Sequence, residues 1–219
     1  MLHSIRGIAR TMNRLDPLSD SCRQEVDQAV DQLRRGKVVA FPTDTLYGLG
    51  ADVFDEPALR RLFAIKGRPA DLALPVLAAD WAQVEMVAGG RSETARRLAE
   101  RFWPGSLTLV LPKAPQLSEL VTGGRNTVAA RIPGHWVPQE LSALLGRPIT
   151  GTSANYSRGP DLLTLEEIEL QLGHLVDYIV RCGPVPQGVP STVVDVTTGK
   201  PCLLREGAIP FNEILRACQ

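Results

Sequence analysis

The sequence lacks an excess of charge, a long apolar run and any paired arrangement of cysteines. Its 24 Lys and Arg residues balance its 24 Asp and Glu residues, so net charge gives no argument for a nucleic-acid partner. No apolar run approaches the roughly 20 residues needed to span a bilayer. The cysteines have no CxxC pair, which argues against a zinc site and a disulfide scaffold; they are Cys22, Cys182, Cys202 and Cys218. These absences predict a cytoplasmic protein with no membrane partner.

The N-terminal stretch MLHSIRGIARTMNRLD has three arginines and no acidic residue before Asp16, and it has no apolar segment typical of a secretory signal. It is compatible with an Arg-rich organellar transit segment or with a short extension. We expect residues 1–20 to be a flexible extension and residues 21–219 to form one domain. The chain of 219 residues is 44% apolar, which is enough to bury a substantial core.

Helical and strand patterns alternate along the chain, which predicts the α/β class. Apolar residues at helical spacing, ending at Gly36, predict a first helix from Asp20. Asp55 is expected to cap a second helix, and Thr164 with Glu167 forms a capping box for a later one. Buried strands are expected over residues 38–41, 74–79, 107–112, 127–133, 177–183, 191–197 and 202–207. Since loops join several of these strands, we expect a mixed, twisted sheet.

The stretch FPTDTLYGLGAD, residues 41–52, combines two threonines, an aspartate and two glycines at the end of a predicted strand. Its glycines do not form GxGxxG, and no GK[ST] follows, so a phosphate-binding loop is weakly supported. We expect Gly48 and Gly50 to shape a turn and Thr45 to be the functional residue.

Lys66 and Arg68, in AIKGRPADLALP, follow the predicted second helix. Positive charge there stabilises the helix dipole by about 0.3–1 kcal/mol, which is one explanation. The other is an anion clamp, because Gly67 and Pro69 end the helix and allow both cations to converge on one phosphate group.

Two further segments place polar groups near strand ends. Arg131, in NTVAARIP, lies in a predicted buried strand and needs a carboxylate partner, supplied either by the protein or by a ligand. Ser153 and Asn155, in ITGTSANYS, can cap a helix or contact a nucleotide. A serine nucleophile is disfavoured because GTSAN is not a GxSxG elbow, and the histidines lie in contexts that indicate no base.

Taken in order, the motifs resemble those of the YrdC/TsaC family, the threonylcarbamoyl-AMP synthases. The family pattern PT[DE]T-x-YGLG, KxRP, RxP, SAN, STVVD and LREG is matched at Pro42–Gly50, Lys66–Pro69, Arg131–Pro133, Ser153–Asn155, Ser191–Asp195 and Leu204–Gly207. The resemblance covers about residues 22–215. It implies one α/β domain whose twisted sheet surrounds a large electropositive cavity, in the short form that lacks an extra C-terminal domain.

The resemblance also implies a reaction. Threonine and bicarbonate or CO2 form a carbamate that attacks the α-phosphorus of ATP, giving threonylcarbamoyl-AMP and pyrophosphate, and partner proteins pass the threonylcarbamoyl group to tRNA. Mg²⁺ is expected on the triphosphate, with no metal ligand from protein side chains. By the resemblance, Lys66 and Arg68 are the catalytic residues, and ATP is bound by Lys66, Arg68, Thr127, Ser153, Asn155 and Arg205. Thr45, Arg131 and Ser191 are expected to bind threonine.

The chain departs from the family pattern at Leu72, Ala73 and Leu77, which puts in doubt an accessory phosphate contact and an accessory threonine contact. A non-catalytic protein that binds tRNA or double-stranded RNA in the same cavity is the main alternative, although the sequence shows no aromatic stacking platform. A third alternative is a family paralogue with carbamoyl-transfer chemistry, against which the intact KxRP and SAN motifs argue.

Overall fold

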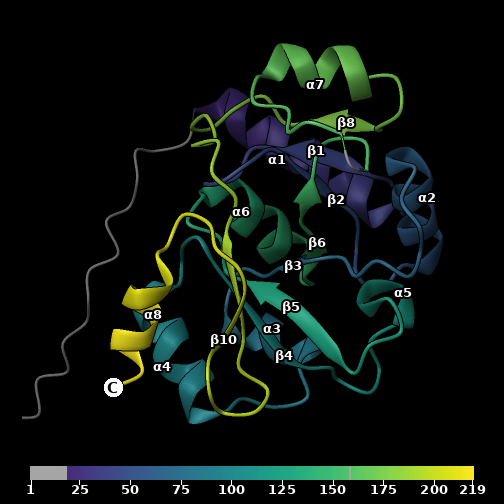
Figure 1. The fold of residues 1–219 in the computed structure, drawn as a ribbon. Coiled ribbons are helices and arrows are strands. Elements are labelled where there is room, and N and C mark those ends of the chain that lie inside the picture. The colour runs from purple at the N-terminus through teal and green to yellow at the C-terminus, as the bar shows by residue number, and fades with distance from the viewer. Residues whose placement is uncertain (1–18, 158) are drawn as a thin grey trace, which may run out of the picture.

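The computed structural model describes residues 19–157 and 159–219, so the extension predicted over residues 1–20 lies almost wholly outside the described residues. Helices and strands alternate in this part of the chain, which confirms the α/β class (Figure 1). The helices are α1 (Asp20–Arg34), α2 (Glu56–Lys66), α3 (Trp81–Val87), α4 (Glu93–Phe102), α5 (Glu119–Thr122), α6 (Trp136–Leu145), α7 (Leu165–Leu172) and α8 (Phe211–Ala217). None of the described helices is long and apolar enough to cross a membrane.

The strand pairing is mixed, as predicted, but the strands form two sheets and not the single sheet expected. One sheet has four strands in the order β7-β2-β1-β8, namely β7 (Thr152–Ser153), β2 (Gly48–Gly50), β1 (Val39–Phe41) and β8 (Tyr178–Ile179). The other has six in the order β10-β9-β4-β5-β3-β6, namely β10 (Cys202–Arg205), β9 (Thr192–Asp195), β4 (Leu107–Pro112), β5 (Thr127–Arg131), β3 (Val76–Leu77) and β6 (Ile149–Thr150). Parallel pairs join β1 to β8, β3 to β5 and β4 to β9, and the other pairs are antiparallel.

The predicted helix caps are present. Asp55 accepts a hydrogen bond from the backbone N–H of Ala58 at 3.0 Å, with a proline in the first turn of α2. Thr164 and Glu167 form the reciprocal capping box of α7. Because each cap satisfies backbone donors that the helix itself leaves free, these residues define where the helices begin.

Gly48 and Gly50 do not shape a turn, which corrects the prediction from sequence. They form β2, which pairs with β1 on one side and β7 on the other. A Cβ at Gly48 would lie 3.0 Å from the Phe41 ring, and one at Gly50 would lie 2.5 Å from it. The glycines therefore make room for a buried aromatic ring that packs against the strand, and the turn lies in the preceding residues.

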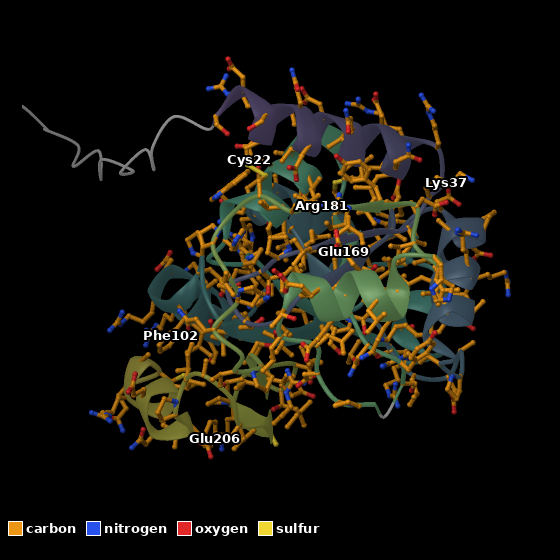
Figure 2. All side chains as sticks on the ribbon, turned by 90° about the horizontal axis from the view of Figure 1, so that it is seen from above. Cys22, Lys37, Phe102, Glu169, Arg181 and Glu206 are labelled. Carbon is orange, nitrogen blue, oxygen red and sulfur yellow. A yellow bond between two sulfur atoms is a disulfide. The ribbon has the colours of Figure 1, made fainter. Side chains whose placement is uncertain are left out.

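Cys22 and Cys182 form a disulfide, so the prediction that the cysteines are unpaired is wrong for these two. The bond joins the first turn of α1, labelled at Cys22 in Figure 2, to the segment that follows β8. In the same segment Arg181 makes an ion pair of 2.9 Å with Glu169 of α7 (Figure 2). Since disulfides persist mainly in oxidising compartments, the cysteines no longer support a cytosolic location.

Candidate functional site

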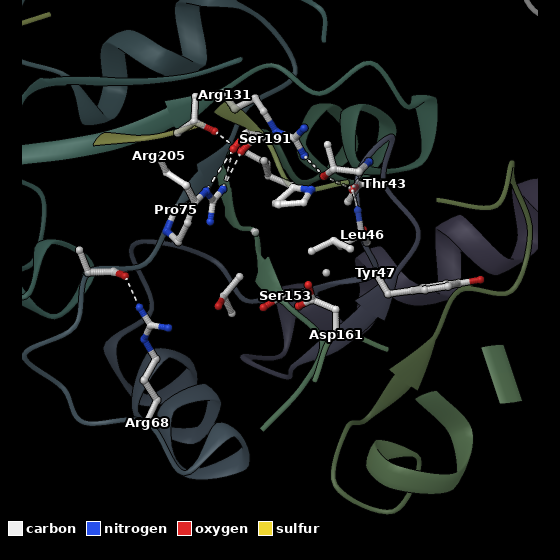
Figure 3. A pocket seen from close by; sticks show the side chains of 18 residues that line it. Thr43, Leu46, Tyr47, Arg68, Pro75, Arg131, Ser153, Asp161, Ser191 and Arg205 are labelled. Atoms are coloured by element: carbon white, nitrogen blue, oxygen red, sulfur yellow. Dashed lines mark hydrogen bonds between the residues drawn. The ribbon is translucent and has the colours of Figure 1, made fainter. Parts of the chain in front are cut away.

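A cavity of about 270 Å³ lies where the two sheets meet (Figure 3). The four-stranded sheet contributes Gly48 and Ser153 to its wall, and the six-stranded sheet contributes Thr108, Arg131 and Arg205. Its remaining lining residues come from loops and neighbouring strand positions: Thr43, Thr45, Leu46, Tyr47, Arg68, Ala73, Pro75, Leu77, Gly151, Thr152, Asp161, Pro190 and Ser191. The lining thus includes three arginines and one aspartate, a composition that suits an anionic ligand.

Arg131 lies at the end of β5 with only 6% of its side chain exposed. A protein carboxylate is its partner, because Nη1 lies 3.1 Å from Oδ1 of Asp44. The Nη2 group donates to Oγ1 of Thr45 at 3.3 Å, and Ser106 donates to Asp44 at 3.0 Å. Burial lowers the pKa of Arg131, and the charge of Asp44 opposes this. Asp44 thereby compensates a buried cation that still lines the cavity.

Arg205, in β10, is fixed against Ser191. Its Nε and Nη2 groups donate to the Ser191 carbonyl at 3.2 and 2.8 Å, and Nη2 also donates to the Ser191 hydroxyl at 3.1 Å. That hydroxyl lies 2.8 Å from Oγ1 of Thr108. A Cβ at Gly207 would lie 2.2 Å from the carbonyl oxygen of Pro190, so glycine is required for this close approach. The final glycine of LREG therefore allows the close backbone packing that positions Ser191.

Arg68 follows the C-terminus of α2, where Gly67 adopts a left-handed conformation with φ 55° and ends the helix as predicted. The Nη2 group of Arg68 donates to the carbonyl of Ala73 at 2.8 Å. Its buried Nε has no hydrogen-bond partner among the residues that the structure describes. Because Arg68 lines the cavity, it retains donors for a ligand.

Lys66 is 1% exposed and lies behind the cavity wall, not in it. Its ammonium group donates to the carbonyls of Ser153 and Asn155 and, at 3.2 Å, to the side-chain oxygen of Asn155. Three acceptors match the three protons of a lysine. Burial and the charge of Arg68 lower the pKa of Lys66 to about 8. Lys66 thus fixes the turn that carries Ser153 into the cavity.

The structure brings together most of the residues that the motifs predicted. Those that line the cavity are Thr45, Arg68, Arg131, Ser153, Ser191 and Arg205. Lys66 and Asn155 support this wall from behind, while Thr127 lies at the opposite end of β5 from Arg131, paired with Pro112. The departures Ala73 and Leu77 are lining residues, and Leu72 is not.

Sequence reasoning assigned no role to several polar residues of the site. Asp44 and Thr43 belong to the same PTDT segment as Thr45. The motif therefore pointed to all three residues, but only Thr45 was assigned a role. Thr108 and Asp161 also line the cavity. Thr108 lies in an apolar strand and Asp161 in a loop, and neither has a local sequence signature.

Comparison with known proteins gives a consistent result. The Sua5/YciO/YrdC family model, described as "Telomere recombination", matches residues 31–207. A relative from Pyrococcus abyssi named threonylcarbamoyl-AMP synthase is 45% identical over 83% of this chain and 54% of its own length. A relative of the same name from Vibrio vulnificus is 39% identical over 83% of this chain and 98% of its own length.

A solved structure of P. abyssi Sua5 complexed with L-threonine has a TM-score of 0.84 and 43% identity, covering 88% of this chain and 56% of that one. The chain therefore spans about half the length of the P. abyssi relatives and nearly all of the V. vulnificus one. The family match covers most of the described chain and includes the strands that build the cavity. The chain belongs to the Sua5/YciO/YrdC family.

Proposed function

We propose that the chain is an L-threonylcarbamoyladenylate synthase, a nucleotidyltransferase that makes threonylcarbamoyl-AMP and pyrophosphate from L-threonine, bicarbonate or CO2, and ATP. The observation that carries this proposal is one cavity in which Arg68, Arg131 and Arg205 line the wall together with the hydroxyls of Thr45 and Ser191. Relatives of 45% and 39% identity carry the name of this activity. A related structure is named as a complex with L-threonine.

The lining residues would divide between the two substrates. Thr45, Arg131 and Ser191 would hold threonine, with Arg131 directed at its carboxylate. Arg68 and Arg205 would hold the ATP phosphates, because each has nitrogen donors beyond those used by the protein. Ser153 would contact the nucleotide. Lys66 would stabilise the bound nucleotide by its positive charge and by fixing the turn that contains Ser153 and Asn155. A nucleotide contact by Thr127 stays a prediction.

The reaction needs positioning and charge stabilisation more than covalent catalysis. The threonine nitrogen bonds to the carbon of CO2 and releases a proton to solvent. A carbamate oxygen then bonds to the α-phosphorus as the bond to pyrophosphate breaks. Negative charge grows on the phosphate oxygens in this step, and the arginines of the cavity would stabilise it.

Mg²⁺ is the proposed cofactor, carried on the triphosphate. Among the described residues, no group of three His, Cys, Asp or Glu side chains could hold a metal ion. Mg²⁺ binds most nucleotide enzymes through substrate phosphates, waters and one or two carboxylates, and Asp161 is the carboxylate in the cavity lining. The residues present therefore fit a magnesium ion that arrives with ATP and neutralises part of its charge.

The proposed downstream partners are proteins that transfer the threonylcarbamoyl group to tRNA, which also makes a cytoplasmic location the expected one. The competing reading was a non-catalytic RNA-binding protein. The names of the relatives favour the enzyme, and so does the burial of Arg131. An RNA backbone is usually bound by exposed cations, whereas Arg131 is buried and paired with Asp44.

The test is pyrophosphate release by the purified protein with ATP, Mg²⁺, bicarbonate and L-threonine. We expect release that requires threonine and bicarbonate, and its absence would refute the proposal. Arg68→Ala should reduce turnover at least 100-fold, as expected for loss of a charged contact to the transition state. Arg60→Ala is the matched control, since Arg60 is an exposed residue of the same region that pairs with Glu56 and does not line the cavity.

A further inference from the structure

The chain between β8 and β9 leads into the cavity wall with few anchors. We call residues 183–190 the strap; its last residue, Pro190, lines the cavity, and so does Ser191, which follows it. Three of its eight residues are prolines, which have no N–H to donate. Within the described chain, three backbone groups of the strap form hydrogen bonds: the Pro184 carbonyl, the Gly188 N–H and the Pro190 carbonyl.

The partner of the first of these groups is His135, whose proton can be placed from its two neighbours. His135 is 4% exposed, and its Nδ1 atom lies 3.1 Å from the backbone nitrogen of Val137 in the first turn of α6. A backbone N–H can only donate, so Nδ1 accepts and carries no proton. The proton of the neutral ring is therefore on Nε2, which donates to the Pro184 carbonyl at 3.1 Å. Burial lowers the pKa of His135, which favours this neutral form.

Gly183 allows the strap to approach this ring closely. Its φ of +107° lies in the region that favours glycine, and a Cβ there would lie 2.8 Å from Cε1 of His135. The ring comes four residues after Arg131, the last residue of β5. His135 thus joins the end of the strand that carries Arg131 to the strap that leads to Ser191.

We propose that His135 is a positioning residue that holds the strap in place beside the amino-acid part of the cavity. The next bond of the strap, from the Gly188 N–H to the Thr45 carbonyl at 2.9 Å, ties it to the turn between β1 and β2. Because each proline fixes its own φ, the strap has few soft dihedrals that could absorb a shift at Pro184. Loss of the His135 bond should therefore displace Gly188. This inference rests on the proposed function, which places threonine against Thr45 and Ser191.

The other contacts of this region do not replace the bond from His135. Glu25 accepts from the backbone N–H groups of Arg181 and Cys182, and Cys182 is bonded to Cys22, but these contacts tie the chain to α1 before the strap begins. His135 itself does not line the cavity, and both of its nitrogens are bonded, so it is not available as an acid or base in the reaction.

The experiment compares His135→Asn with His135→Gln in the full chain, because each amide replaces one ring nitrogen. The Oδ1 atom of asparagine takes the place of Nδ1 and retains the cap of α6, but the side chain is too short to reach Pro184. The amide nitrogen of glutamine takes the place of Nε2 and retains the bond to Pro184, but α6 loses its side-chain cap. Hydrogen exchange of the Gly188 amide, measured by NMR, reports the strap. Urea unfolding reports stability, and pyrophosphate release at varied threonine reports the function.

In His135→Asn we expect the Gly188 amide to exchange about 3- to 10-fold faster, the range of one neutral hydrogen bond. The KM for threonine should rise by a similar factor, with kcat within about twofold of the wild type. His135→Gln should match the wild type in both respects in spite of a lower midpoint of urea unfolding. The amide of Val180, which donates to the Ala40 carbonyl ahead of the strap, is the control and should exchange equally in all three proteins.

The outcomes separate this inference from the proposed function. A wild type without threonine-dependent pyrophosphate release would refute the function, while the exchange of Gly188 would still test whether His135 anchors the strap. With an active wild type, the inference is overturned if Gly188 exchanges at the wild-type rate in His135→Asn or if the KM for threonine is unchanged there. It is also overturned if the less stable variant has the larger KM, since a purely structural role would rank the variants by stability.

Discussion

Replacement of Gly123 and of its neighbour Gly124 by alanine should separate loop positioning from backbone strain. Gly123 caps α5 with φ +59°, and Gly124 has φ +74°, so both adopt the left-handed conformation that favours glycine. Only Gly123 has close neighbours. A Cβ there would lie 2.3 Å from the carbonyl oxygen of Asp71 and 3.0 Å from the nitrogen of Ala73, whereas nothing lies within 4 Å of one at Gly124.

The two alanine substitutions share a cost in stability, and only one of them is expected to displace the loop of Arg68. Each alanine costs about 1–2 kcal/mol of stability because of its positive φ. Ordinary contact begins near 3.4 Å, so Gly123→Ala must also push residues 71–73 away by about 1 Å. The carbonyl of Ala73 accepts from Arg68, and this segment is tied to α5 by the bond from Leu74 to Val121. Since a displacement of about 1 Å can cost up to 100-fold in rate, we expect roughly a 10- to 100-fold loss in kcat/KM for ATP.

The assay combines urea unfolding with pyrophosphate release at varied ATP. Both variants should lose the stability that the positive φ costs, Gly123→Ala should lose more because of its steric contact, and only Gly123→Ala should lose ATP efficiency. Gly123→Asn and Gly124→Asn provide a second pair, because asparagine tolerates the left-handed conformation and leaves the steric contact as the main difference. Equal kinetic effects at the two positions would refute the reasoning that α5 positions the loop of Arg68.

Two further predictions concern stability. Because the pKa of Lys66 falls from 10.5 to about 8 on folding, the unfolded chain binds more protons between these values. The free energy of unfolding of the wild type should therefore rise, relative to that of Lys66→Met, by at most about 3 kcal/mol between pH 8 and pH 10.5. Urea unfolding measures this difference, and a difference that stays constant with pH would contradict the prediction. The disulfide between Cys22 and Cys182 closes a sequence separation of 160 residues, so reduction should lower the midpoint of thermal unfolding by roughly 5–15 °C. Cys22→Ser should abolish this response to reductant. Cys202→Ser, at a free cysteine, should leave the response intact. A response in Cys22→Ser equal to that of the wild type would exclude the bond.

The sequence predicted best what is decided locally. Helices α2 and α7 begin where Asp55 and Thr164 can cap them, since a cap is a contact between residues close in the chain. Strand β4 matches its predicted range of 107–112 in full. A strand end was expected beside Thr152, but no range was predicted for the two-residue strands β6 and β7, because a strand of that length has no periodicity and exists only through its partner. The same holds for β2, whose glycines reflect the ring of Phe41 and not a turn.

The site divides in the same way. Ordered motifs identified six of the lining residues, but they could not identify the partners with which each residue forms hydrogen bonds and ion pairs. Asp44 reaches Arg131 across 87 residues, and Lys66 reaches the carbonyl of Asn155 across 89. A lysine two positions before an arginine in the sequence indicates two side chains that bind phosphate. Only the fold shows that the ammonium of Lys66 donates its hydrogen bonds to the turn at residues 153–155.

The three arginines of the cavity are held to different degrees, and the difference separates the two that the proposal places on the ATP phosphates. Arg131 is fixed by Asp44 and Thr45, and Arg205 by three hydrogen bonds to Ser191. Within residues 19–157 and 159–219, Arg68 has one bond, to Ala73, on a loop that follows a helix end. A side chain with one anchor and a buried free donor has the most to gain from a ligand, because an unpaired buried N–H is costly. Arg131 and Arg205 are therefore preorganised, while Arg68 completes its hydrogen bonding only when an anion enters.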